Sequence, residues 1–219
     1  AGANRAIHPD YTWITHFFKI LSDGIEDPRK LGENVSIICF NYDRCIEYYL
    51  AKTIAAAYGI SEDDGLSIVE ERFNIIHPYG YLGRLSLDPD YADDERTPFG
   101  FEADNNDIMG RMIDGIKTYT EQAHNVASVL LMHHAMVTCK NLVFLGFGFN
   151  NQNLDLLRVK HRYDTDTAHR NVYATGMGLY RQIDETLKRR IMDLFIDSSP
   201  SNHWSSRVHI EYGEGCTGL

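Results

Sequence analysis

The stretch "VSIICFNYDRCIEYYL", residues 35–50, places four polar residues inside an apolar run. Residues 35–40 are nearly continuous in apolar and β-branched side chains, a pattern typical of a strand that is covered on both faces. From Ile46 onward, apolar residues recur at three- and four-residue spacing, which predicts a helix. The polar residues 41–44 therefore lie where a buried strand ends and a helix begins.

The same alternation of strands and helices continues along the chain. The predicted elements are helices over 11–22, 43–58, 108–137, 152–160 and 180–196, and strands over 35–40, 74–77, 142–147, 171–175 and 207–212. The segment "SEDDGL", residues 61–66, is expected to end the helix before it. The acidic segment 88–107 is rich in turn formers and is expected to be a long loop or lid. Apolar strands between helices indicate an α/β fold with a mostly parallel sheet.

Composition and charge narrow the class of protein. A chain of 219 residues could form one α/β domain or two small ones, and a single domain over residues 1–219 is the expected arrangement. With 43% hydrophobic residues, it can bury a large core. The net charge of −10 argues against direct binding of nucleic acid, which requires a basic face. No run of about eighteen apolar residues is present, which argues against a membrane span. The N-terminus lacks the features of a signal peptide, and four cysteines without a C-x-x-C pair favour reduced thiols in the cytoplasm.

Three polar motifs follow directly after predicted strands. They are "FNYD", "HPYG" and "GFGFNNQN", which begin at Phe40, His77 and Gly146. Ligands of parallel α/β sheets bind beyond the carboxyl ends of the strands. We therefore expect the three motifs to line one rim of the sheet.

The first motif offers two polar side chains for a ligand. Asp43 is suited to cap the following helix, a role that leaves a ligand contact open. The amide of Asn41 has two donors and an acceptor, either for loop backbone or for a bound ribose or water. Arg44 and Glu47 are expected to be helix-surface or ion-pair residues.

The second motif supplies a candidate general base. His77 ends a strand, and Pro78 forces an extended backbone at that position. Histidine titrates nearest to neutral pH, so a His at the rim is suited to accept a proton, although a contact with a loop carbonyl is an equally ordinary role. His133 and His134 are expected to be packing or surface residues of a helix, and the sequence has no spacing typical of a metal site.

The third motif is a glycine-rich turn between a strand and a helix. Gly146 and Gly148 allow a close approach of the backbone to a ligand, and equally allow a tight turn without one. Asn150, Asn151 or Asn153 is expected to cap the helix, and Asn150 is the one placed to contact a sugar hydroxyl instead.

The order of these motifs resembles that of the sirtuin superfamily, and in particular the sirtuin-like domains of bacterial proteins, which include NAD-cleaving modules of antiphage defence systems. The resemblance is carried by "ICFNYDRCIEYYL", "IIHPYGYLG", "LVFLGFGFNNQNLDLL" and "VYATGMGL", which span residues 35 to about 180. It implies a Rossmann-like domain that binds NAD⁺, with a mostly parallel sheet and helices on both faces. It also implies that His77 acts as a base, that Asn41 positions the ribose or the attacking water, and that Asp43 helps to hold the nicotinamide end.

The resemblance further implies that Gly146, Gly148 and Phe149 lie by the adenosine ribose. We therefore expect a cytoplasmic, metal-free NAD⁺ hydrolase that releases ADP-ribose and nicotinamide as part of antiphage defence. Expected partners are NAD⁺ or a related nucleotide and other parts of a larger protein, and a homo-oligomer is left open. The alternatives are a non-catalytic sensor of NAD⁺ or an ADP-ribose-type nucleotide, and an interaction scaffold without a pocket.

Two features depart from the usual pattern of the sirtuin superfamily. The segment "AGAN", residues 1–4, resembles the end of a Gly-Ala-Gly phosphate loop, but the strand that usually precedes this loop is not in the sequence. The chain does not begin with Met, so we expect either a fragment without that strand or a protein that has lost part of the phosphate cradle. The zinc-ribbon module of deacylating sirtuins is also missing, which disfavours protein deacylation.

Overall fold

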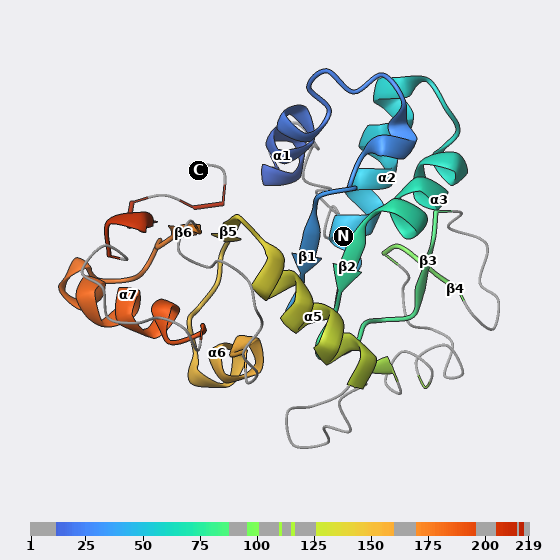
Figure 1. Ribbon diagram of the computed structural model, residues 1–219. Coiled ribbons are helices and arrows are strands. Elements are labelled where there is room, and N and C mark those ends of the chain that lie inside the picture. Colours follow the sequence, from blue (N-terminus) through green and yellow to red (C-terminus); the bar gives the residue numbers. More distant parts are fainter. Residues whose placement is uncertain are drawn as a thin grey trace, which may run out of the picture. The chain divides into compact units, whose positions relative to one another are not determined.

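The computed structural model describes residues 12–87, 96–100, 110, 115–116, 126–159, 170–195, 205–213 and 215–216. The chain forms two compact units, residues 1–124 and 125–219, and each is described by itself (Figure 1). The expectation of one domain over residues 1–219 stays a prediction.

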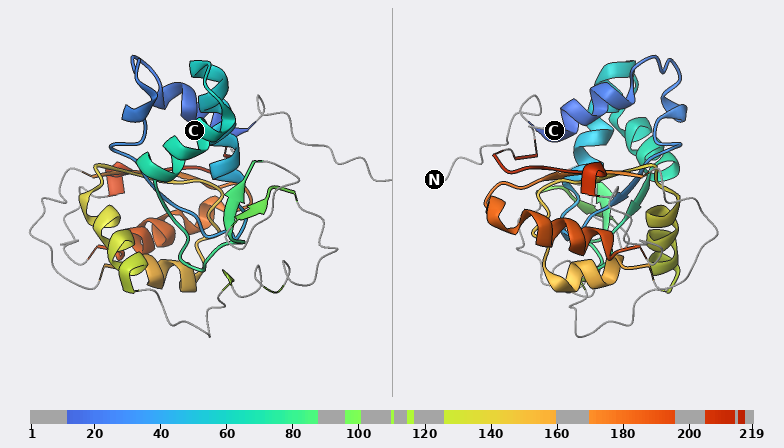
Figure 2. Two further views of the ribbon diagram at one scale, coloured as in Figure 1. Left: turned by 90° about the vertical axis from the view of Figure 1, so that its right-hand side faces the viewer. Right: turned by 60° about the vertical axis from the view of Figure 1, so that its left-hand side comes forward.

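Three α-helices build most of the core of the first unit. They are α1 (Trp13–Leu21), α2 (Cys45–Tyr58) and α3 (Glu62–Arg72), and a short 3₁₀ helix, Pro28–Lys30, lies between α1 and the first strand. The three helices form one group in Figures 1 and 2. Their buried side chains pack together with Leu31, Phe73 and Leu85, which lie outside these helices, into one hydrophobic cluster. Its helical members are Ile14, Phe18, Leu50, Ala51, Ile54, Leu66, Ile68 and Val69.

Helix α3 corrects the expectation that residues 61–66 only end a helix. Helix α2 does end at Gly59, which adopts a left-handed backbone with φ 65°. A new helix then begins, because the Ser61 hydroxyl accepts a hydrogen bond from the backbone N–H of Asp64 at 3.1 Å. The acidic first turn, which looks like a break in the apolar pattern, is favourable at the positive end of a helix dipole.

Two pairs of parallel strands complete the first unit. Strand β1 (Ser36–Ile38) pairs with β2 (Asn74–Ile76), and β3 (Arg84–Ser86) pairs with β4 (Arg96–Pro98). Strand β4 falls inside the acidic segment 88–107, so this part is not the loop that the sequence predicts. Residues 88–95 and 101–107 of that segment lie outside the described residues.

The second unit contains a three-stranded parallel sheet. Its strand order is β5 (Asn141–Phe144), β6 (Asn171–Thr175) and β7 (Val208–Glu211). Side chains on one face, among them Val172 and Ala174, are buried, whereas Val143 on the other face is 49% exposed. The expectation of helices on both faces of one sheet stays a prediction.

Helices α5 (Val126–Thr138), α6 (Asn151–Leu157) and α7 (Asp184–Met192) complete the second unit, and α7 follows a 3₁₀ turn, Arg181–Ile183. Helices α6 and α7 lie next to each other below the strands in both figures. Of the predicted helix over 108–137, most of residues 108–125 lies outside the described residues. Backbone carbonyls at the C-terminal end of α5 accept hydrogen bonds from the buried guanidinium of Arg170. It donates to the carbonyls of Val137 and Cys139 at 2.6 and 3.0 Å.

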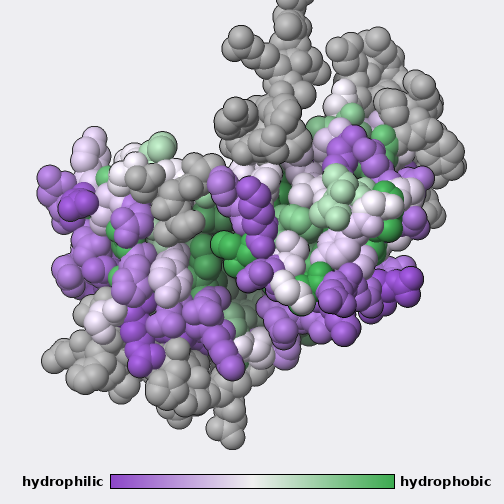
Figure 3. All heavy atoms as spheres, turned by 90° about the horizontal axis from the view of Figure 1, so that it is seen from above, coloured by the Kyte–Doolittle hydropathy of each residue, from purple (hydrophilic) through white to green (hydrophobic). Residues whose placement is uncertain are grey.

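The fold is therefore α/β, and every described strand pairs in parallel with its neighbour. Among the described residues, the ladders form three separate sheets, so a single Rossmann-like sheet remains a hypothesis. Within the described ranges, no helix is both long enough and apolar enough to cross a membrane. Hydrophilic and hydrophobic side chains are both visible on the face shown in Figure 3.

Candidate functional site

The first two polar motifs meet at the ends of β1 and β2. These strands run in parallel and in register, with Ile38 opposite Ile76, so they end at the same level. The backbone N–H of Cys39 continues the ladder with a bond to the carbonyl of Ile76 at 2.9 Å. Asn41 and His77 are consequently brought together from positions 36 residues apart in the sequence.

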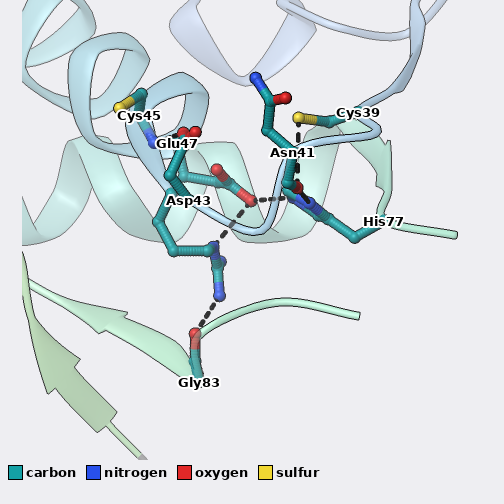
Figure 4. Close-up of polar contacts among 8 residues, drawn as sticks. Cys39, Asn41, Asp43, Cys45, Glu47, His77 and Gly83 are labelled. Atoms are coloured by element: carbon teal, nitrogen blue, oxygen red, sulfur yellow. Dashed lines mark hydrogen bonds and ion pairs between the residues drawn. The ribbon is translucent and has the colours of Figure 1, made fainter. Parts of the chain in front are cut away.

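Both ring nitrogens of His77 contact hydrogen-bond acceptors (Figure 4). Nδ1 lies 3.0 Å from the backbone carbonyl oxygen of Asn41, and Nε2 lies 2.9 Å from Oε1 of Glu47. A carbonyl accepts only, and so does an ionised carboxylate, so both nitrogens donate when Glu47 is ionised. The geometry therefore fits a doubly protonated imidazolium ring, whose side chain is only 3% exposed.

Glu47 lies in the first turn of α2 and contacts two cations. Its Oε1 also accepts a hydrogen bond from Nε of Arg44 at 2.9 Å, and the residue is 4% exposed. Its second oxygen, Oε2, is buried and has no hydrogen-bond partner among the described residues. The two cations stabilise the buried carboxylate in its charged form, because a buried carboxylate without them would favour its neutral form.

The pKa values of this pair move in opposite directions. Burial alone would lower the pKa of His77, but contacts with Cys39, Glu47 and the Asn41 carbonyl, together with the charge of Glu47, raise it to about 9. We regard Glu47 as the main cause, because a neutral thiol is a weak acceptor whereas a carboxylate carries a full charge. Burial would raise the pKa of Glu47, but the hydrogen bond to His77 and the charges of Arg44 and His77 lower it below its usual value.

The other two polar side chains of the first motif point elsewhere. The side-chain amide of Asn41 belongs to an exposed residue and points away from the His77 ring in Figure 4. The part of Asn41 that contacts the His77 ring is therefore its backbone carbonyl and not its side-chain amide. Asp43 Oδ1 accepts a hydrogen bond from the backbone N–H of Cys45 at 3.0 Å, so it satisfies the first residue of α2, which begins two residues later than predicted.

The turn after β2 packs against the same ionic cluster. The Tyr81 ring lies 4.4 Å from the Arg44 guanidinium carbon and 5.5 Å from the His77 ring centre. Arg44 also donates to the backbone carbonyl of Gly83. Gly80 and Gly83 both have positive φ, 80° and 78°, which allows the tight turn that brings these groups back to α2.

The third motif belongs to the second unit. The N–H of Gly146 donates to the Thr175 hydroxyl at 2.9 Å, which ties the turn to the end of β6. Phe149 has a φ of 50° and is 3% exposed, so its ring is a core side chain. Asn150 caps α6 with a bond from the Asn153 N–H at 2.8 Å, which is the ordinary one of its two predicted roles. Gly148 has open space where a side chain would begin.

The sequence interpretation did not identify Glu47 as part of the site. It treated Arg44 and Glu47 as surface or ion-pair residues; they do form an ion pair, but a buried one. The spacing of Glu47 relative to the apolar residues of the helix is the signal that indicates its burial. Glu47 precedes Leu50 and Ile54 by three and seven residues and so shares their buried face, where a charged side chain needs a partner. His133, by contrast, is the packing residue that was expected, with Nε2 3.1 Å from the Leu156 carbonyl oxygen.

Comparisons with known proteins add no family to this description: no family model, no curated protein and no solved structure matches the chain. Over the described ranges, no group of three or more His, Cys, Asp or Glu side chains is arranged to hold a metal ion.

Proposed function

We propose that this chain is a Rossmann-like, sirtuin-like domain that binds NAD⁺ and hydrolyses its nicotinamide–ribose bond, acting in the cytoplasm as part of a larger bacterial defence protein. The observation that supports it best is the contact between His77 and Asn41 at 3.0 Å. Two residues that the resemblance assigns to the reacting ribose lie together at the ends of neighbouring parallel strands, which is where α/β sheets bind ligands.

The chemistry asks little of the protein beyond orientation and one proton acceptor. Cleavage of the nicotinamide–ribose bond builds positive charge on the sugar and releases a neutral pyridine. The protein has to hold NAD⁺, exclude bulk water and accept a proton from the attacking water. The exposed amide of Asn41 is suited to hold the ribose or the water.

His77 can accept a proton only after it has lost one. Because its contacts raise its pKa to about 9, the neutral ring is a minor form at neutral pH. An imidazolium beside the developing positive charge would also oppose the reaction. If His77 is the base, the rate of hydrolysis should therefore increase with pH until about pH 9.

The same observation favours a second candidate, a non-catalytic sensor of NAD⁺ or an ADP-ribose-type nucleotide. A ring that donates from both nitrogens is suited to fix a loop or bind an acceptor rather than to act as a base. In a sensor, the cluster would keep the rim in one shape, and ligand binding would be transmitted to partner domains.

The deciding experiment measures binding and turnover of NAD⁺ between pH 6 and pH 10. Nicotinamide release is followed by chromatography and binding by calorimetry. We expect turnover by the wild-type chain, a rate that increases toward high pH and a lower rate in Asn41→Ala. In His77→Gln we expect a loss of at least 100-fold, a size typical of removing a general base. Gln retains a donor for Glu47, which limits damage to the fold.

The matched control is His134→Gln, because His134 is an exposed histidine on α5. It should retain wild-type activity. Binding without turnover at every pH would select the sensor. Full activity in His77→Gln would contradict the assignment of His77 as the base, and absence of both binding and turnover would contradict both proposals.

A further inference from the structure

One carboxylate oxygen is shared by two cations in this site. Oε1 of Glu47 is 2.9 Å from Nε2 of His77 and 2.9 Å from Nε of Arg44. Since the ring donates from both nitrogens, the three side chains carry one negative and two positive charges. Each cation therefore weakens the attraction of the carboxylate for the other.

The described side chains around the His77 ring come from the end of β1, the turn after β2 and the start of α2. The Cys39 thiol approaches from the end of β1, and Tyr81 packs on the ring from the turn after β2. Glu47 and Arg44 face it from the start of α2. Of these neighbours, Glu47 is the one carboxylate in hydrogen-bond contact with the ring among the described residues, and Arg44 carries the opposing charge.

The Glu47 contact also decides where the ring lies. The carboxylate holds one ring nitrogen while the Asn41 carbonyl holds the other, so the imidazole is fixed at both ends between α2 and the end of β1. Loss of the carboxylate would leave the Nε2 side of the ring without its acceptor. The Asn41 backbone, which carries the exposed amide, would then lose a fixed partner.

We propose that Glu47 is a positioning residue of this site: its carboxylate holds the His77 ring against the Asn41 carbonyl and retains the ring proton, while Arg44 weakens that retention. The inference deepens the proposed function and rests on it only for its kinetic consequence. It makes Glu47 and Arg44 opposing controls on the proton that His77 must lose before it can act as a base.

The proposal predicts opposite effects of two neighbouring substitutions. In Glu47→Gln the attracting charge is removed, so the His77 ring should lose its proton at lower pH. In Arg44→Gln the repelling charge is removed and the carboxylate is left to His77 alone, so the ring should keep its proton to higher pH. A role limited to packing would shift both variants in the same direction or in neither.

The test is an NMR titration of the imidazole nitrogens in the whole chain, without any nucleotide. His77→Gln identifies the His77 signals. In wild type we expect both ring nitrogens to be protonated at pH 7 and to titrate near pH 9. The midpoint should fall by at least one pH unit in Glu47→Gln and should rise in Arg44→Gln.

Glu62→Gln is the matched control, since Glu62 forms an ion pair with Lys52 at 3.0 Å that is more exposed. Its His77 midpoint should equal that of wild type. If Glu47→Gln does not fold, Glu47→Asp keeps the charge but shortens the side chain, and a smaller fall of the midpoint is expected. Equal midpoints in wild type and the folded Glu47 variant, or shifts of one sign in both substitutions, would overturn the proposal.

A second measurement separates this inference from the proposed function. If the chain hydrolyses NAD⁺, the pH at which the rate is half-maximal should move with the NMR midpoint in each variant. A shifted midpoint in a chain without turnover would support the role of Glu47 and contradict the hydrolase. An unshifted midpoint would contradict the role of Glu47 whatever the activity.

Discussion

The carboxylate of Glu47 influences the charge of His77 at the ends of β1 and β2. Glu47 occupies a position on the buried face of α2 that an apolar residue would ordinarily fill, and it is tolerated there because His77 and Arg44 supply donors and positive charge. Removing one partner of such a cluster leaves an uncompensated buried charge, which is far costlier than losing an exposed ion pair. The stability of the fold should therefore depend on pH through this cluster.

His77 is expected to make the free energy of unfolding fall at alkaline pH. Its pKa is about 9 in the folded protein against 6.5 for an ordinary histidine, so its contribution is complete below about pH 6.5 and is lost as pH rises through 9. A shift of this size corresponds to about 3 kcal/mol. Urea unfolding of wild type from pH 6 to pH 10 measures the loss.

The comparison that tests this expectation is His77→Gln, which should lack the alkaline fall between pH 6.5 and 9. His134→Gln, at an exposed position, should retain it. Glu47 affects stability in the acidic range instead. Because its pKa is lowered in the folded protein, its contribution to the free energy of unfolding is present above pH 4.5 and is lost as the pH falls. Parallel curves for wild type and His77→Gln would show that the cluster does not govern the pH dependence.

At the scale of elements, the crossing of α2 and α3 depends on one glycine. A side-chain carbon built at Gly65 would overlap the backbone carbonyl oxygen of Ala51 and lie 3.3 Å from the Cβ of Ala55. The two helices can approach this closely only because position 65 has no side chain. This packing fixes α2, the helix that begins at the candidate site.

We expect Gly65→Ala to destabilise the protein by about 1–3 kcal/mol, because the added methyl group forces the two helices apart. Alanine is a better helix former than glycine, so helix propensity alone predicts that the substitution stabilises the protein. Urea unfolding at pH 7 shows whether the free energy of unfolding falls or rises. Ser67→Ala, on the exposed side of α3, is the matched control and should be neutral or slightly stabilising. A Gly65→Ala protein that is as stable as wild type would refute the close crossing.

The elements that the sequence missed are short or lack an apolar period. Strands β3 and β4, with the sequences RLS and RTP, are as short as β1 and β2 but contain no run of apolar residues that would mark a strand. Helix α3 was missed because an acidic turn and a glycine were interpreted as a break, whereas Ser61 and that acidic turn form its start. The cores of β1, β2, β5, β6 and β7 were predicted correctly because their apolar runs are bounded by polar residues.

At the scale of the whole molecule, charge restricts the partners that the chain can bind. The net charge is −10 and the isoelectric point is near 5.4. A polyanion that approaches a protein with this net charge is repelled beyond the range of local contacts, and there is no basic composition to release its counterions.

We therefore expect no measurable binding of a duplex DNA oligonucleotide at physiological ionic strength. An electrophoretic mobility shift at micromolar protein measures it, with a basic DNA-binding protein as the positive control. Lowering the salt concentration should not create a complex, because weaker screening strengthens the repulsion. A shifted band that disappears at high salt would contradict this expectation.

The sequence alone predicts the α/β alternation, the parallel strands and the polar motifs that follow three of the strands. These are local properties, because periodicity and strand ends are set by side chains a few positions apart. The contacts and charges of these polar residues depend on the tertiary structure. The Asn41 amide points away from His77, and Glu47, 30 residues distant in the chain, is buried against the His77 ring and raises its pKa. The affinity of a side chain for a proton depends on the charges around it and on its burial. Both are set only when the strands and α2 have packed together.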